Sequence, residues 1–272
     1  MMLTSKTYTI RGTKITLLDN KQIFYAKEFI IKELQFDLYN FNNINLSGGV
    51  TDNHVLIDLG GNMGTLAIYL ALKYPNLKIY SYEADPKNFA IYQQNILLNN
   101  LENHENLKAF NLAVTKDGKD VYIQRAYQSG ANKISSTNNS TKEFDIVKSI
   151  TLDDIIKNHN IKSIKYLKVD IEGSEFDVIY ASESFKNIPI EYYGGEVHGT
   201  LQENTDLIQY IKSVVNPNKI YIEEIYNRKL ITLIGKIVHK YYTICYPFPL
   251  LRSFNFHILF YIIQVVMQFI RK

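Results

Sequence analysis

A glycine-rich turn is the first place in the chain where residue types and spacing could do chemistry. It reads Asp58-Leu-Gly-Gly-Asn-Met-Gly64 and follows a short apolar run. Glycine lets a backbone approach a ligand closely, and the start of a following helix offers free N–H groups. The spacing differs from the G-x-G-x-x-G pattern that binds a pyrophosphate. An acid at position 58 would repel a phosphate but would suit a cationic ligand, such as an amino group or a sulfonium.

A second acid follows the next predicted strand. Glu83, in Tyr82-Glu-Ala-Asp-Pro86, lies 83 − 61 = 22 residues after Gly61. Nucleotide-binding βαβ units place an acid at about 20 residues, where it accepts hydrogen bonds from ribose hydroxyls. We therefore predict a ribose contact for Glu83, with Ala84 beside it; a solvated turn residue is the alternative. Asp85 is explained by helix capping before a proline.

The third predicted strand ends in Asn111-Leu-Ala-Val114. Ligands of open parallel sheets lie outside the carboxyl ends of the strands. Ala113 is small enough to leave room for a flat ring against the backbone. We predict that it borders the base of a bound nucleoside, and an ordinary alanine at the edge of the core is the alternative.

Acids and a histidine follow the fourth and fifth predicted strands. Asp170 and Glu172 come after the fourth, whereas Glu196 and His198 end the fifth and share one face by strand alternation. Acids at the end of a buried strand are costly unless they meet a cation, a donor or water. We predict that these four residues form the polar wall where an acceptor hydroxyl arrives. His198 could be a general base or a hydrogen-bonded structural group.

Three further interpretations concern this wall. Glu175 begins the next predicted helix, where the helix dipole favours an acid without any catalytic role. The main interpretation involves no metal ion, but the three carboxylates and the histidine could instead bind a divalent cation that lowers the pKa of the hydroxyl. The loop Ser129-Gly-Ala-Asn132 could close over an acceptor or be plain surface.

The elements that must hold these residues alternate between strands and helices from residue 54 onward. This alternation predicts a parallel sheet wrapped by helices. The apolar runs predict strands at 55–57, 77–82, 107–114, 164–169, 190–197 and 220–225. Residues 120–124 could add a strand beside the third or a neighbour, and the polar residues 126–148 predict a loop. Helical patterns predict helices at 63–73, 87–99 and 205–215, and capping patterns predict further helix starts at Thr151 and Ser174.

Both ends of the chain differ from this pattern. The pattern in residues 1–53 predicts an extension with short strands at 8–10, 15–18 and 23–25 and a helix at 27–38. Residues 229–234 predict a last antiparallel strand or part of a helix. The apolar run 256–270 has 15 residues, fewer than the roughly 17–25 that span a bilayer. We expect a buried or dimer-forming helix there, or alternatively an anchor at a membrane surface.

The composition is that of an ordinary globular protein. The chain has 272 residues, 46% hydrophobic and 21% charged, which excludes wholesale disorder and fibrous classes. Its net charge of +3 gives no argument for nucleic-acid binding. The single cysteine, Cys245, excludes an internal disulfide and a cysteine-based zinc site. The first residues show no export signal, so we expect a cytoplasmic protein, with peripheral membrane contact through the tail as the alternative.

Five motifs occur in order and together resemble one family. They are Asp58-Leu-Gly-Gly-Asn-Met-Gly64, Tyr82-Glu-Ala-Asp-Pro-Lys-Asn-Phe89, Ser149-Ile-Thr-Leu-Asp-Asp154, Leu167-Lys-Val-Asp-Ile-Glu-Gly-Ser-Glu175 and Glu196-Val-His198. Over about residues 54–200 the chain resembles the FkbM family of S-adenosylmethionine-dependent methyltransferases. The family usually has alanine where Gly61 stands, a departure that should not disturb cofactor binding.

The resemblance implies an α/β fold, a Rossmann-like seven-stranded methyltransferase sheet with helices on both faces. The implied domain is 54–234, between the extension 1–53 and an apolar helical tail at 235–272. The expected cofactor is S-adenosyl-L-methionine, and its predicted contacts are Asp58, Gly60, Gly61, Asn62, Gly64, Glu83, Ala84, Ala113 and Asp170. The expected reaction is O-methylation of a sugar, glycan or other small acceptor by an enzyme that could be a homodimer. A catalytically silent scaffold of the same fold is the alternative, and an NAD-dependent oxidoreductase is disfavoured by the turn spacing.

Overall fold

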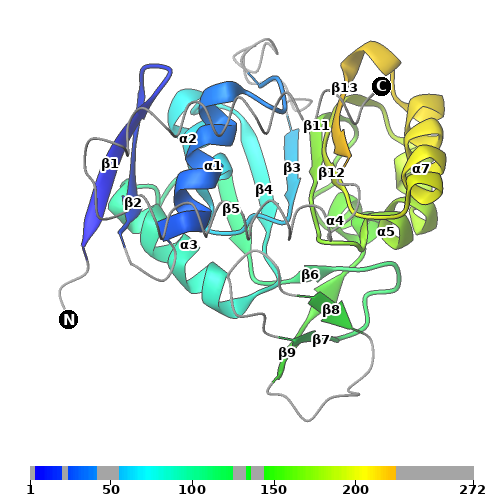
Figure 1. The fold of residues 1–272 in the computed structure, drawn as a ribbon, viewed down its shortest axis with the longest axis horizontal. Coiled ribbons are helices and arrows are strands. Elements are labelled where there is room, and N and C mark those ends of the chain that lie inside the picture. Colours follow the sequence, from blue (N-terminus) through cyan, green and yellow to red (C-terminus); the bar gives the residue numbers. More distant parts are fainter. Residues whose placement is uncertain (1–3, 20–23, 42–54, 125–132, 136–143, 225–272) are drawn as a thin grey trace, which may run out of the picture. The chain divides into compact units, whose positions relative to one another are not determined.

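The computed structural model of the chain describes residues 4–19, 24–41, 55–124, 133–135 and 144–224. Within them, six parallel strands form a sheet in the order β13-β12-β11-β3-β4-β5 (Figure 1). The strands are β3 (Val55–Leu59), β4 (Lys78–Tyr82), β5 (Leu107–Phe110), β11 (Ile164–Val169), β12 (Ile190–Val197) and β13 (Ile220–Glu224). The chain leaves β3 first toward β5 and later toward β13. The strand order therefore reverses between β3 and β11, where open α/β sheets bind ligands.

Helices cover both faces of this sheet because the strand side chains alternate. Leu56 and Tyr166 belong to one apolar layer, which also contains residues of α1, α2 and α3; Ile57 and Leu167 belong to the layer that contains residues of α4 to α7. The helices are α1 (Phe24–Phe36), α2 (Thr65–Lys73), α3 (Pro86–Leu98), α4 (Leu152–Asn158), α5 (Glu175–Ala181), α6 (Glu183–Asn187) and α7 (Leu201–Val214), with a 3-10 turn at Pro217–Lys219. The predicted fold class is confirmed.

Local side-chain caps decide where several helices begin. Asp85 accepts from the N–H of Lys87 before α3, and Thr151 accepts from the N–H of Asp154 before α4, as predicted. The helix start predicted at Ser174 is confirmed, because α5 begins at Glu175, but the Ser174 side chain forms no cap hydrogen bond. The helix predicted from 205 begins at Leu201, because Thr200 and the third helical residue form a reciprocal capping box.

The segment after β5 differs most from the prediction. The third predicted strand is two pieces, β5 and the two-residue β6 (Ala113–Val114), which pairs with β10 (Ser149–Ile150). Residues Val121–Gln124 form β7, which pairs with β8 (Lys133–Ser135) and β9 (Phe144–Val147) in a separate antiparallel sheet. Figure 1 shows this small sheet beside one end of the main sheet. The predicted loop 126–148 therefore contains two strands, whereas Ser129–Asn132 lies outside the described residues.

The N-terminal extension is a hairpin followed by a helix. Strands β1 (Ser5–Ile10) and β2 (Thr13–Leu18) pair antiparallel, and Arg11 and Gly12 turn the chain with φ of 44° and 84°. The predicted strand at 23–25 is wrong, because α1 already begins at Phe24. Its β-like residues are followed directly by a helix-forming run, and the helix extends back into them.

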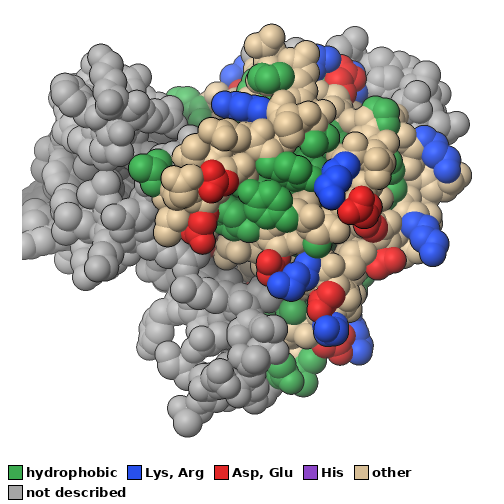
Figure 2. Space-filling view, turned by 90° about the vertical axis from the view of Figure 1, so that its right-hand side faces the viewer, with side chains coloured by type: hydrophobic (Ala, Val, Ile, Leu, Met, Phe, Trp, Pro, Cys, Tyr) green, Lys and Arg blue, Asp and Glu red, His purple; other side chains and the backbone are tan. Residues whose placement is uncertain are grey.

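The seventh strand and the apolar tail, predicted within residues 225–272, lie outside the described residues. In the described part of the chain, no helix is long and apolar enough to cross a bilayer. Figure 2 shows the end of the molecule that includes α7, where acidic and basic side chains alternate around an apolar area. The charges on this face are thus mixed in sign and form no single-sign patch among the residues described.

Candidate functional site

The glycine turn joins β3 to α2 at the carboxyl edge of the sheet. The N–H groups of Gly60 and Gly61 both donate to the last carbonyl of β4 at 2.9 Å. Gly60 and Gly64 have φ of 89° and 75°, a region that favours glycine. A Cβ on Gly60 would collide with the carbonyl oxygen of Asp170, and one on Gly64 with the ring of Tyr92. Packing within the protein requires both glycines, in addition to the ligand contact predicted for them.

Asp58 lies behind this turn, inside the sheet. Its buried carboxylate accepts a hydrogen bond from Ser81 Oγ at 2.8 Å and pairs with Lys168, whose Nζ is 3.2 Å from Oδ1. Nζ also donates to the carbonyl of Gly60 at 2.7 Å. Burial alone would lower the pKa of Lys168, but the carboxylates of Asp58 and Asp170 outweigh it and raise that pKa. Asp58 is thus paired within the protein, and its direct contact with a cationic ligand stays a prediction.

A pocket opens in front of the turn. Its polar lining includes Glu83, Asp85 and Asn88. Its apolar lining includes Leu112, Val114 and Ile123, the last from the small antiparallel sheet. The remaining lining comes from the glycine turn, Tyr82, Ala84 and the loop that follows β11. A pocket with both polar and apolar lining is suited to a nucleoside, whose sugar is hydroxylated and whose base is flat.

Glu83 is held at this pocket by the backbone around it. Its carboxylate accepts from the N–H of Asn62 at 2.6 Å and from the N–H of Asp85 at 2.8 Å. Burial raises the pKa of Glu83 to about 7, although these N–H groups oppose the rise. The first N–H comes from the glycine turn and the second from the start of α3, so one carboxylate joins the two loops. Glu83 thus lies beside the glycine turn, and the ribose contact predicted from the spacing of 22 residues stays a prediction.

The same pocket fits the cofactor that the resemblance implies. Asn62 Oδ1 is buried and has no hydrogen-bond partner among the described residues, so it could accept from an ammonium group. Glu83 offers carboxylate oxygens to ribose hydroxyls, and Leu112 and Val114 offer an apolar surface to a base. Ala113, predicted for that surface, is fully buried, and the residues on either side of it line the pocket instead. Strand alternation in β6 explains this difference.

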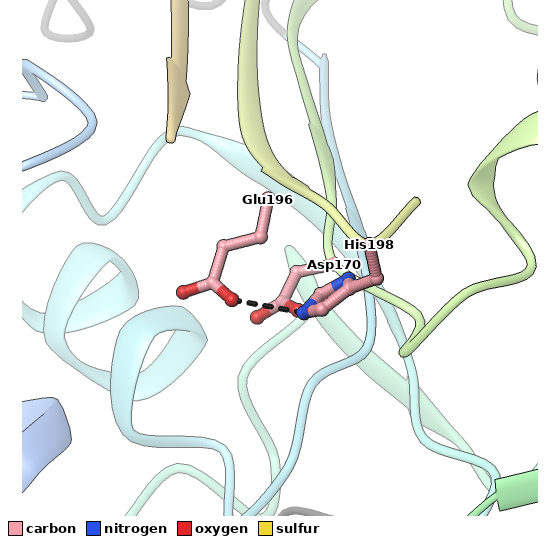
Figure 3. Close-up of side chains that lie close together, drawn as sticks. All are labelled: Asp170, Glu196 and His198. Carbon is pink, nitrogen blue, oxygen red and sulfur yellow. Dashed lines mark ion pairs between the residues drawn. The ribbon is translucent and has the colours of Figure 1, made fainter. Parts of the chain in front are cut away.

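The predicted polar wall forms at the ends of β11 and β12. Figure 3 shows Asp170, Glu196 and His198 pointing toward one another. His198 Nε2 lies 3.1 Å from Glu196 Oε2 and 3.9 Å from Glu172 Oε2. The four predicted residues therefore come together as expected, although their chemical roles stay predictions.

The protonation states of this wall follow from its burial and its pairs. Burial and the neighbouring Asp170 raise the pKa of Glu196 to about 7, although His198 opposes the rise. Burial would lower the pKa of His198, but Glu175 and Glu196 outweigh it and raise that pKa to about 10. His198 is accordingly an imidazolium at neutral pH, a form that has no lone pair to accept a proton.

Glu175 belongs to the wall although the sequence predicted only a helix-dipole role. Its side chain is fully buried, and Oε1 lies 3.0 Å from His198 Nδ1. It also accepts from the backbone N–H groups of Ile171 and Gly173. No spacing signal points to this contact, because the two residues are 23 positions apart and on different elements.

The N-terminal extension contributes two further residues that were not predicted from the sequence. The hydroxyl of Tyr39 donates to Glu196 Oε1 at 3.5 Å, and the carbonyl of Tyr39 accepts from Tyr166 at 2.8 Å. Burial, followed by the charges of Glu196 and Asp170, raises the pKa of Glu33 on α1 to about 9. The extension therefore forms part of the surroundings of the wall.

The metal alternative can be tested against the charges present. One ligand atom each from Asp170, Glu196 and His198 could hold an ion, because these atoms lie within 4.8 Å of one another. However, Lys168 Nζ is 3.6 Å from Asp170 Oδ2, and the His198 imidazolium pairs with Glu196. At neutral pH a metal ion would have to displace the ring proton of His198 and compete with Lys168 for Asp170, which disfavours the metal interpretation.

Fold and site together describe a nucleoside-type pocket beside a charged wall at the switch point of a doubly wound sheet. The family model described as the Methyltransferase FkbM domain matches residues 58–219. That match covers more than half of the chain, so the chain belongs to the FkbM methyltransferase family.

Individual relatives are distant. The chain is 26% identical over 192 residues to "Methyltransferase 1" of Beauveria bassiana (strain ARSEF 2860), covering 61% of this chain and 74% of that one. It is 23% identical over 181 residues to "Methyltransferase sdnD" of Sordaria araneosa, covering 56% and 67%. A crystal structure of an FkbM methyltransferase from Methylobacillus flagellatus KT is 16% identical with a TM-score of 0.39; the match covers 72% of this chain and 50% of that chain.

Proposed function

We propose that this protein is an S-adenosylmethionine-dependent methyltransferase that methylates a hydroxyl group of a sugar, glycan or other small acceptor. The observation that carries the proposal is the position of Glu83, which faces the pocket while its carboxylate joins the glycine turn to the start of α3. When bound, S-adenosylmethionine would supply a methyl group carried on a sulfonium, from which the sulfur can leave as an acceptor oxygen attacks the methyl carbon in line.

The pocket binds the cofactor, and the polar wall binds the acceptor. Glu83 and Asn62 hold the hydroxylated and charged parts of the cofactor, and the apolar lining of the pocket excludes water from its base. The acceptor hydroxyl arrives between the pocket and Glu196. Fixing the oxygen in line with the methyl carbon removes much of the entropic part of the barrier.

We assign the role of general base, which accepts the proton of the hydroxyl, to the carboxylate of Glu196. As the oxygen–methyl bond forms and the sulfur–methyl bond breaks, the electron pair stays on sulfur and the proton moves to Glu196. His198 is already protonated and cannot take it, whereas the pKa of Glu196, raised to about 7, suits a base near neutral pH. A base of this kind contributes roughly 10²–10⁴-fold to the rate.

A two-part experiment tests the proposal. Calorimetry with S-adenosylmethionine and its demethylated product measures binding, and transfer of a labelled methyl group to a panel of hydroxylated acceptors measures turnover. We expect binding and transfer in the intact chain, and binding without appreciable transfer in Glu196→Gln. Binding without transfer in the unchanged chain across the panel would favour the scaffold alternative, and binding of NAD alone would favour an oxidoreductase.

A further inference from the structure

Glu175 is an unusual acid for the first residue of a helix. Two other helix-start acids among the described residues are exposed: the side chain of Glu183 on α6 is 71% exposed, and Glu203 on α7 is exposed as well. Glu175 is 0% exposed. A carboxylate buried to this degree is costly unless it is paired and hydrogen-bonded, so its partners indicate what it does.

Those partners come from two separate loops. Oε1 accepts from the N–H of Ile171 at 3.0 Å, and Oε2 accepts from the N–H of Gly173 at 2.9 Å, both in the turn that follows β11. Oε1 also lies 3.0 Å from Nδ1 of His198, beyond the end of β12. A single carboxylate thus joins the turn that lines the cofactor pocket to the histidine of the acceptor wall.

This arrangement fixes the imidazole ring in one orientation. With Nδ1–H directed at Glu175, the other ring nitrogen faces Glu196 Oε2 at 3.1 Å. Backbone N–H groups and His198 outweigh burial and lower the pKa of Glu175, so it stays ionised and favours the imidazolium. The titratable groups that face this ring are Glu172, Glu175, Glu196 and Asp170, with Lys168 next to Asp170.

We propose that Glu175 is a positioning residue of the methyl-transfer site, holding the ring of His198 so that Nε2 faces Glu196. This inference rests on the proposed function for its effect on turnover, but the Glu175–His198 contact is measurable without any reaction. In this arrangement His198 supports the ionised form of Glu196, which then accepts the proton of the hydroxyl. Removing the charge of Glu175 lowers the pKa of His198, and Glu196 then stays protonated over a wider pH range.

The test compares Glu175→Gln and Glu175→Asp with Glu203→Gln, an exposed helix-start control whose side chain caps α7 at Thr200. In protein labelled at its six histidines, NMR follows the imidazole signals from pH 5 to 11, and His198→Gln identifies the signal of His198. We expect that signal to titrate near pH 10 in the unchanged chain. It should titrate at least one pH unit lower in Glu175→Gln, at an intermediate pH in Glu175→Asp, and unchanged in Glu203→Gln.

Turnover measurements test the same Glu175–His198 contact through its effect on kcat. Glu175→Gln should lower kcat at least tenfold, with KM for the cofactor within about twofold, and should move the acidic limb of the pH profile upward. A His198 titration unchanged in both Glu175 variants would overturn the proposal, as would a kcat unchanged in an active enzyme. If the intact chain transfers no methyl group, the proposed function fails while the titration still decides the Glu175–His198 contact. If Glu175→Gln does not fold, Glu175→Asp provides the same comparison.

Discussion

Lys168 and Asp58 are register partners on the neighbouring strands β11 and β3, and their charged atoms lie 3.2 Å apart in the middle of the sheet. Their side chains are 7% and 1% exposed. Asp58 in turn pairs in register with Ser81 on β4, which donates to its other oxygen. A polar row therefore crosses three strands directly beneath the glycine turn.

Removing one member of this row should destabilise the fold strongly. Lys168→Met leaves the buried charge of Asp58 without its cation, and such losses cost about 3–5 kcal/mol. Denaturant unfolding monitored by circular dichroism measures the change. Lys186→Ala, which removes an exposed pair with Glu183, is the control and should leave the midpoint unchanged. Equal small effects in both variants would show that the buried pair contributes little.

Glu83 should control cofactor affinity in a pH-dependent way. Glu83→Gln removes a charged acceptor of ribose hydroxyls, which should weaken binding of S-adenosylmethionine tenfold to about a hundredfold. The pKa of Glu83 in the free protein is raised to about 7, and binding favours the ionised form. Affinity should therefore fall as the pH drops through 7, by about tenfold between pH 8 and pH 6. Calorimetry from pH 6 to 8 measures this, and a flat profile would contradict the ribose role.

Two glycines with similar backbone angles should respond differently to alanine. Gly12 (φ 84°) has nothing within 4 Å of an added Cβ, whereas an added Cβ on Gly60 (φ 89°) collides with the carbonyl of Asp170. Gly12→Ala should cost only the left-handed backbone strain of about 1–2 kcal/mol. Gly60→Ala should cost about 1–3 kcal/mol more through overpacking and should also weaken cofactor binding. Unfolding and calorimetry on both variants check this, and matching losses would contradict it.

The stabilising contribution of His198 should be lost in alkaline solution, so the fold should be less stable there. Its folded pKa is raised to about 10 from an ordinary value of 6.5. Its contribution to the free energy of unfolding is therefore fully present below about pH 6.5, declines above that pH and is lost as the pH rises through 10. The intact chain should lose more stability than His198→Gln between pH 7 and 10.5. Urea unfolding at several pH values measures the two slopes, and parallel slopes would contradict the pairing.

The sequence predicted those parts of the site that lie at strand ends. Glu83 and the glycine turn meet because the spacing of a βαβ unit is fixed by geometry. Asp170, Glu196 and His198 meet because the carboxyl ends of neighbouring parallel strands share one edge.

The sequence did not predict contacts that depend on tertiary packing. Glu175 pairs with His198 through a fold-dependent meeting of two loops, and Tyr39 reaches Glu196 across 157 positions. Strands β8 and β9 were missed because the polar composition of their surroundings outweighs their short alternating patterns. Asp58 was predicted as a ligand contact because a sequence does not show the lysine that the register places beside it.

The amide of Asn95 on α3 has a consequence for how the chain can be shortened. It accepts from the N–H of Leu18 at the end of the hairpin and donates to the carbonyl of Met63 in the glycine turn. Asn99, one helical turn further on, closes a second pair of bonds with Thr16. A shortened chain that starts after the hairpin would strip these amides of their partners next to the glycine turn. The hairpin Ser5–Leu18, which bears no chemical motif, is thereby part of the framework that keeps that turn in shape.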